Sequence, residues 1–145
     1  MSLFSVLSVS ASGMAAQRTR AELLVENLAN AETTRTPEGG PYRRKEVVFA
    51  SQPVDSPFSS IFSALAEPAA NGVAVEDVLV DTREPERRYL LGHPDADAGG
   101  YVAFPRVNPA EDMVDLMNAS RSYHAGVSAM TAIKDMIQRS IDLLR

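Results

Sequence analysis

The distribution of proline constrains the fold of this chain more than any other feature. All nine prolines lie between Pro37 and Pro109, together with six of the eight glycines, whereas the segments before and after them contain no proline. Proline breaks helices and glycine weakens them, so long helices are confined to the two ends of the chain. We therefore expect three parts: residues 1–32, residues 33–108 and residues 109–145.

The first part carries an apolar repeat that is typical of a helix packed on another helix. Its apolar residues follow alternating steps of three and four, as in the a and d positions of a coiled-coil seam. Gly13 and several serines weaken this helix, so we expect it to need a partner. An ordinary amphipathic helix on a globular core would show the same repeat. The seam residues are Phe4, Leu7, Ala11, Met14, Ala21, Val25 and Leu28, with Arg18 as the break.

The last part begins with the signals of a helix N-terminus, and its apolar residues continue the alternating steps of three and four. Asn108 occupies the cap position, Pro109 the first turn, and acidic residues follow at the positive end of the helix dipole. Roughly 35 residues at 1.5 Å each make a helix of about 50 Å. Gly126 marks a candidate close contact. The seam residues are Met113, Leu116, Tyr123, Val127, Met130, Ile137, Ile141 and Leu144, and Met117, Ile133 and Met136 widen the apolar stripe.

Such a long helix overhangs a chain of this size, and the N-terminal helix cannot cover its whole stripe. We therefore expect the fold to be α+β, with the two terminal helices pairing as a coiled-coil-like axial domain and a small β-rich domain inserted between them. The remaining apolar surface must be covered by other copies or by other proteins.

The middle part reads as short strands and loops. Strands are expected at residues 42–49, 73–80, 88–91 and 101–104, and residues 51–70 as a loop with at most one helical turn. The first helix is expected to end at Asn27 and Asn30, through a left-handed asparagine. The basic run at residues 43–45 is either a solvated strand edge or a contact with an acidic partner surface.

Composition excludes several functions. The net charge is −5 with a pI near 5.0, so nucleic acid is not an expected partner. No run approaches the roughly 18 apolar residues of a membrane span, and the N-terminus lacks the features of a cleaved Sec signal. With no cysteine and only two histidines, no metal or other cofactor is expected. A minor hypothesis is a hydrolase that uses Glu111, Asp115 and His124.

Specific motifs carry a family resemblance. Asn27-Leu28-Ala29-Asn30-Ala31 resembles the N-terminal signature shared by bacterial flagellar axial proteins, which form the rod, hook and hook-associated structures. Residues 33–45, 100–102 and 105–108, with residues 119–123 of the last helix, are similar to the proximal rod proteins of that family. The sequence departs from the family pattern at Glu32, His124 and Gly126.

The resemblance implies a structural subunit of the basal-body rod, in the periplasm, that is exported without a cleaved signal peptide. Such subunits pass through the flagellar type III export apparatus, and their terminal helices then build a tube that transmits torque and conducts later subunits. The implied partners are other copies, other rod proteins and the adaptor between rod and membrane ring. Asn27 and Asn30 have either a polar role between subunits or a plain role at a helix end. The alternative function is a self-contained helical module such as a secretion chaperone or adaptor.

Overall fold

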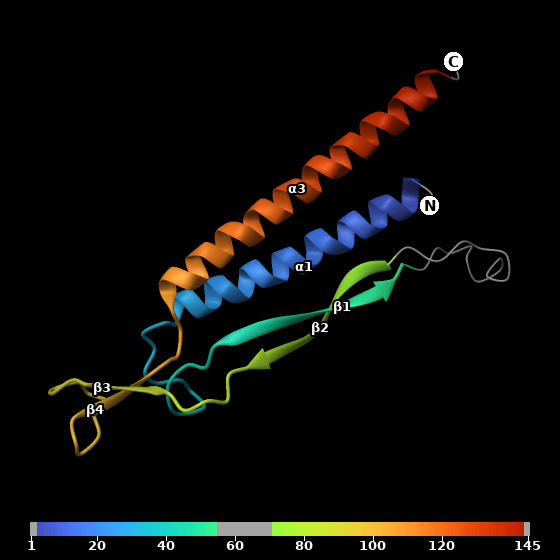
Figure 1. Ribbon diagram of the computed structural model, residues 1–145. Coiled ribbons are helices and arrows are strands. Elements are labelled where there is room, and N and C mark those ends of the chain that lie inside the picture. Colours follow the sequence, from blue (N-terminus) through green and yellow to red (C-terminus); the bar gives the residue numbers. More distant parts are fainter. Residues whose placement is uncertain (1–2, 55–70, 144–145) are drawn as a thin grey trace.

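The computed structural model describes residues 3–54 and 71–143 of the chain. Two long helices flank two small pairs of strands, which is an α+β fold (Figure 1). The elements in chain order are α1 (Leu3–Ala29), β1 (Lys45–Pro53), β2 (Asn71–Val80), β3 (Glu86–Tyr89), β4 (Tyr101–Phe104) and α3 (Pro109–Asp142).

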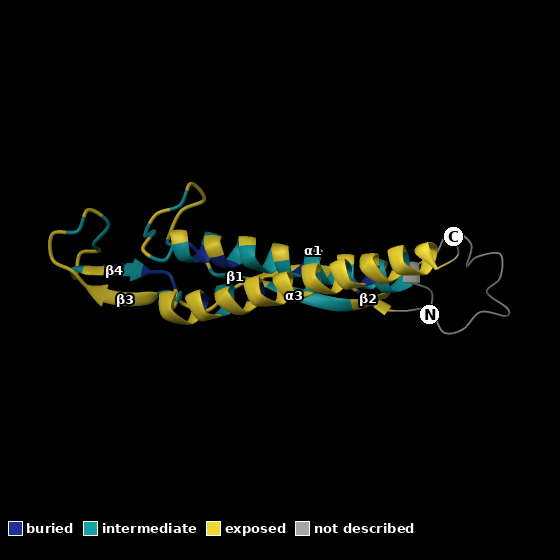
Figure 2. Ribbon diagram, turned by 90° about the horizontal axis from the view of Figure 1, so that it is seen from above, coloured by how far each residue is buried: buried dark blue, intermediate teal, exposed yellow. Residues whose placement is uncertain are grey.

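The two helices run antiparallel, with both chain termini at the same end of the molecule (Figure 1). Helix α1 lies between α3 on one side and the β1–β2 pair on the other, whereas β3 and β4 lie beyond the opposite end of the helices. Since α1 packs on two neighbours and α3 on one, α1 is more covered than α3. Figure 2 shows α3 and β3 largely exposed, whereas most of α1 is of intermediate burial.

The β1–β2 pair is antiparallel and lies against α1, with a close approach at Gly72 and Val73. The Val73 N–H donates to Ser12 Oγ at 3.1 Å. The neighbouring Gly72 has no side chain, and a Cβ there would lie 2.6 Å from the same Ser12 oxygen. The ladder shifts register between Val48 and Phe49, and this β-bulge leaves Glu76 without an opposite residue.

The β3–β4 pair is a second, separate two-stranded sheet. Its turn uses glycines with positive φ, among them Gly100 at +79°. Val102 of β4 is fully buried, and Phe104 is nearly so. The core is small and is shared among the elements; its buried apolar residues are Ala16, Leu24, Tyr42, Val102, Phe104, Ala119 and Ile133.

The end of α1 and the start of α3 lie where the sequence predicts them. The way in which α1 ends differs from the prediction. The Asn108 side chain accepts from the Ala110 N–H at 3.2 Å and caps α3, as predicted. Helix α1 ends at Ala29, near the predicted asparagines. The prediction of a left-handed asparagine is wrong, because no described residue other than glycine has a positive φ. Asn30 instead donates through its backbone N–H and its side chain to the Glu26 carbonyl.

The predicted strands agree with the observed strands in position, but their first and last residues agree less well. The predicted strand at residues 101–104 coincides with β4, and those at 73–80 and 88–91 overlap β2 and β3. The predicted strand at 42–49 is shifted: β1 starts at Lys45 because the preceding residues are used in contacts with the helices. Residues 51–53 belong to β1 rather than to a loop. Residues 55–70 of the expected loop lie outside the described residues.

Candidate assembly interface

One face of α3 packs against α1. Its buried members are Asp112, Ala119 and Ile133, and the residues at intervening turns of the same face are half-buried. These half-buried residues are Leu116, Gly126, Met130 and Ile137. Successive members are three or four residues apart, except for one step of seven between Ala119 and Gly126. Of the predicted seam, Leu116, Met130 and Ile137 lie on this face, whereas Met113, Tyr123, Val127 and Ile141 are exposed.

A second apolar face of α3 has no covering partner among the described residues. Met117 keeps 55% of its surface exposed and Met136 keeps 52%. The other exposed apolar residues of α3 are Met113, Val114, Tyr123, Val127, Ile141 and Leu143. Four of these residues, Met113, Met117, Val127 and Ile141, fall within about 120° of one another around the helix, and exposed apolar side chains gathered on one face mark an interaction site. We call Met113, Met117, Val127 and Ile141 the exposed row.

The predicted seam of α1 also contains both half-buried and exposed residues. Leu7, Met14, Ala21 and Leu28 are half-buried, whereas Ala11 and Val25 are exposed. The side chains of Phe4 and Leu144 lie outside the described residues. The buried positions of α1 are Ala16, Leu24 and Asn27. None of them belongs to the predicted apolar seam, and only Asn27 had been singled out in the sequence.

Gly126 is a point of close helix approach, as its place in the sequence suggested. A Cβ at this position would lie 2.5 Å from the Cγ atom of Met14 and 3.2 Å from its sulfur. The Met14 side chain therefore occupies the space that the glycine leaves empty, and the two residues fix how α1 and α3 align.

We expect Gly126→Ala to destabilise the chain by about 1 kcal/mol, because overpacking against Met14 exceeds the gain in helix propensity. In a Met14→Ala background the same change should stabilise by about 1 kcal/mol, since the obstacle is gone and alanine favours the helix. Urea unfolding of the four proteins measures both values. Equal effects in the two backgrounds would mean that the contact does not determine the cost.

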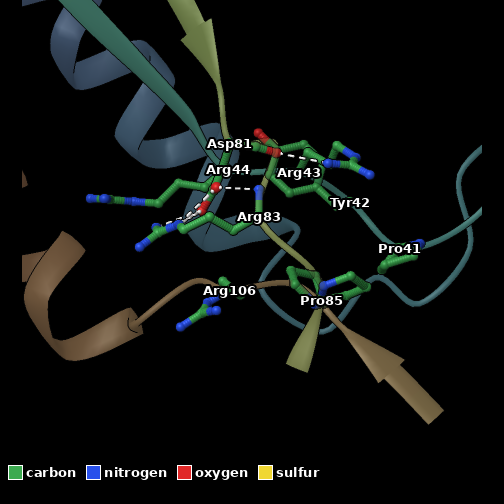
Figure 3. A pocket seen from close by; sticks show the side chains of 9 residues that line it. Pro41, Tyr42, Arg43, Arg44, Asp81, Arg83, Pro85 and Arg106 are labelled. Carbon is green, nitrogen blue, oxygen red and sulfur yellow. Dashed lines mark hydrogen bonds and ion pairs between the residues drawn. The ribbon is translucent and has the colours of Figure 1, made fainter. Parts of the chain in front are cut away.

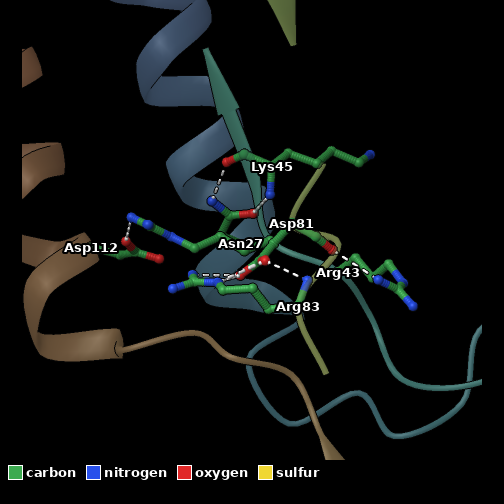
Figure 4. A network of polar contacts seen from close by, with 7 residues as sticks. Asn27, Arg43, Lys45, Asp81, Arg83 and Asp112 are labelled. Atoms are coloured by element: carbon green, nitrogen blue, oxygen red, sulfur yellow. Dashed lines mark hydrogen bonds and ion pairs between the residues drawn. The ribbon is translucent and has the colours of Figure 1, made fainter. Parts of the chain in front are cut away.

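Asn27 makes three hydrogen bonds that join α1 to β1 and to the residues just before it, and Figure 4 shows the two to Lys45. Its Nδ2 donates to the Lys45 carbonyl at 2.8 Å, and its Oδ1 accepts from the Lys45 N–H at 2.9 Å. The same Oδ1 accepts from the Tyr42 hydroxyl at 2.9 Å. Burial, with a contribution from the nearby Glu26 charge, raises the pKa of Tyr42 to about 12, so its hydroxyl remains a donor. Asn27 is 0% exposed and acts like a strand partner for Lys45.

A buried ion pair joins the same region to α3. Arg44 Nη2 lies 2.7 Å from Asp112 Oδ1, and the Asp112 side chain is only 1% exposed (Figure 4). The interaction with Asp112 raises the pKa of Arg44 despite its partial burial. Arg44 Nε and Asp112 Oδ2 are buried and have no hydrogen-bond partner among the described residues, so the Asp112 carboxylate depends on its one bond to Arg44. The pair ties the chain before β1 to the first turn of α3.

The connection from β2 to β3 is held by a local ion pair. Arg83 Nη2 lies 2.6 Å from Asp81 Oδ2, and the Arg83 backbone N–H also donates to this carboxylate (Figure 3). These bonds from Arg83 lower the pKa of Asp81 to about 2, from an ordinary value of 3.8.

The lowered pKa predicts an acid dependence of stability. The folded chain binds a proton at Asp81 more weakly than the unfolded chain, so this contribution is complete above pH 3.8 and is lost as pH falls towards about 2. We expect Asp81→Asn to flatten the fall of Tm across this window. The two proteins are compared by thermal unfolding at successive pH values; parallel curves would contradict the assignment.

The arrangement does not favour the hydrolase hypothesis. Asp115 pairs with Arg20 of α1 at 3.7 Å, and His124 is exposed beside the Tyr123 ring. Asp115 and His124 are nine residues apart on one helix, or about 14 Å along its axis. No group of three or more potential metal ligands occurs within residues 3–54 and 71–143. In the same part of the chain, no helix has the length and apolar character of a membrane span.

Comparison with known proteins identifies the family. Residues 98–143 match the family model "Flagellar basal body rod FlgEFG protein C-terminal". The chain is 41% identical to the flagellar basal-body rod protein FlgC of Bacillus subtilis, with 99% of each chain covered. It is 37% identical to FlgC of Borreliella burgdorferi, over 100% of this chain and 99% of the relative. It is 38% identical to FlgC of Salmonella typhimurium, over 99% of this chain and 98% of the relative.

The chain belongs to the FlgC family. It is thus a structural subunit of the flagellar basal-body rod, as the resemblance in its motifs implied. The FlgC-like motifs coincide with the contacts described above. The asparagine signature supplies Asn27, residues 33–45 supply Tyr42 and Arg44, and the last helix supplies the two apolar faces.

The sequence did not single out every residue of this FlgC region. Ala16 and Leu24 are buried because α1 has neighbours on two sides. A single heptad stripe describes the contact with only one of these neighbours. Asp112 had been assigned to the helix dipole, which is consistent with its place in the first turn. Its partner Arg44 is 68 residues away, and no local pattern indicates that pairing.

Proposed function

We propose that this chain assembles into the wall of the proximal rod through the exposed row of α3 and the adjoining faces of α1. In this proposal residues 1–32 and 109–145 form the axial helical domain, and residues 33–108 form the β-rich domain. The observation that carries the proposal is the row of large apolar side chains on α3 that neither α1 nor any described strand covers.

The energetics support assembly through this face. Each CH₂ group removed from water contributes about 0.8 kcal/mol, so a row of methionine, valine and isoleucine side chains is a substantial source of association energy. A helical tube requires heterologous contacts, in which one face of a subunit meets a different face of the next. The exposed row and the exposed residues of α1, including Ala11 and Val25, give the subunit such faces on both helices.

The remaining features of the proposal are carried over from the resemblance. The tube would serve as drive shaft and export conduit, and the subunit would reach it through the type III export apparatus without a cleaved signal. Its neighbours would be other copies, other rod proteins and the adaptor to the membrane ring. The role is structural and not enzymatic, in keeping with the relatives, which are rod proteins.

Two adjacent residues provide a matched test. Met117 and Asn118 are both exposed, and only Met117 belongs to the exposed row. We expect Met117→Asp to leave the stability of the free subunit within about 0.5 kcal/mol of wild type, as for most surface changes. Incorporation into basal bodies and motility should nevertheless be lost.

The control is Asn118→Asp, which introduces the same charge one residue away and should be incorporated normally. Each variant is expressed in a strain that lacks the native gene, and basal bodies are purified and probed for the subunit. A Met117→Asp strain with normal motility and a normal content of the subunit would overturn the proposal.

A further inference from the structure

Four arginines gather where the helices meet the β3–β4 pair. Arg43 and Arg44 precede β1, Arg83 lies between β2 and β3, and Arg106 lies between β4 and α3 (Figure 3). They line one cavity of about 20 Å³ together with a single carboxylate, that of Asp81. This arginine cluster is strongly basic, although the whole chain carries a net charge of −5.

Two of the four charges are already neutralised. Arg44 pairs with the buried Asp112, and Arg83 pairs with Asp81. Arg43 donates to the Asp81 backbone carbonyl at 3.0 Å and has no carboxylate partner among the described residues. Arg106 is exposed and makes no ion pair in the described part of the chain. The cluster therefore presents two unpaired guanidinium groups.

The backbone around the cluster is stiff. Pro41, Pro85 and Pro105 come from the three connections that meet here, and each has a fixed φ (Figure 3). The cavity is only large enough for the end of a side chain. Guanidinium groups bind carboxylates with paired, charge-assisted hydrogen bonds, so exposed carboxylates are the groups that this surface fits best.

We propose that the arginine cluster docks the acidic pair Glu76 and Asp77 of a neighbouring copy of this chain. The inference rests on the proposed assembly into the rod and names one contact within it. Outside the arginine cluster, each copy is more acidic than its net charge of −5 indicates. A neighbouring copy can therefore supply carboxylates to the cluster.

Glu76 and Asp77 stand out among the acidic residues. The sequence contains only two pairs of adjacent acids, and in the other pair Asp112 is buried and already bound to Arg44. Glu76 and Asp77 are both exposed and form no ion pair with any described residue. The β-bulge leaves Glu76 without an opposite residue, and Asp77 accepts only from the Val78 N–H.

The placement also suits a head-to-tail contact. Asp77 lies four positions before Asp81 of the cluster, which corresponds to about 13 Å along an extended strand. The cluster and the acidic pair of one copy are therefore displaced along the molecule, and parallel copies staggered by a similar distance would bring one against the other. Such a contact is heterologous and repeats along a helical assembly.

A charge exchange tests this contact. We expect Arg43→Glu/Arg106→Glu to reduce incorporation into basal bodies by about tenfold or more, because like charges facing each other oppose association. Adding Glu76→Lys/Asp77→Lys should restore incorporation, since the two surfaces again have opposite charge. Adding Glu38→Lys, which reverses an exposed acid in another turn, should not restore it.

Cross-linking in motile cells gives an independent result. The chain has no cysteine, so Arg106→Cys together with Asp77→Cys introduces one defined pair. On oxidation of basal bodies we expect dimers or longer ladders of the chain, and none from Arg106→Cys with Glu38→Cys. If the variant is incorporated but gives no such product, or if the charge exchange fails to restore incorporation, the docking proposal is wrong. The proposed function fails separately, if Met117→Asp is incorporated like wild type.

Discussion

Replacing Asn27 with alanine is expected to destabilise the free subunit by about 3–5 kcal/mol, the largest effect of any single substitution considered. The change removes three hydrogen bonds and leaves the Lys45 N–H, the Lys45 carbonyl and the Tyr42 hydroxyl without their partner in a buried place. Each buried polar group without a partner costs about 1–3 kcal/mol. Because α1 and β1 both depend on this residue, we also expect little Asn27→Ala protein in assembled rods.

The measurement is urea unfolding of the purified full chain. Asn118→Ala is the matched control, since this asparagine is exposed on α3 and should change stability by no more than about 0.5 kcal/mol. A loss below about 1 kcal/mol in Asn27→Ala would mean that water replaces the side chain and that Asn27 does not hold the helix to the strand.

The second large effect concerns the buried ion pair. Arg44→Met keeps much of the side-chain volume but leaves the Asp112 carboxylate, which is 1% exposed, without its cation. Removing one partner of a buried pair costs about 3–5 kcal/mol; since one-fifth of the Arg44 side chain is exposed, we expect about 2–4 kcal/mol. The position of Asp112 at the helix N-terminus offsets part of this cost.

A double-mutant cycle separates the pair from the rest of the site. Arg44→Met/Asp112→Ala should be more stable than Arg44→Met alone, because the second change removes the stranded charge. Unfolding of the two single variants and the double variant gives the coupling energy. If the costs of the single changes simply add, the two side chains do not interact in solution and the assignment is wrong.

The sequence predicted the parts of this fold that local signals determine. The absence of proline from both ends gave the two helices, and Asn108 with Pro109 gave the start of α3 to the residue. Alternating apolar residues placed the strands to within a few positions. In each case the deciding interactions lie within a few residues of one another along the chain.

Contacts between distant segments could not be predicted in this way. The shift of β1 to Lys45 follows from Tyr42 and Arg44 turning to Asn27 and Asp112, and these pairings are specified by tertiary structure alone. The width of the stripe on α3 did predict surplus apolar surface. Which residues face α1 and which remain exposed depends on the rotation of α3, which is set in part by Gly126 and Met14.

The most direct test of the central claim, that assembly covers the exposed row, is thiol labelling at one position. Because the chain has no cysteine, Met113→Cys introduces a single reactive group at a side chain of the exposed row that is 52% exposed in the free subunit. We predict rapid reaction with a maleimide in the purified subunit and strong protection in isolated basal bodies. Equal labelling rates in both would contradict the account and favour a self-contained module whose α3 face stays open to solvent.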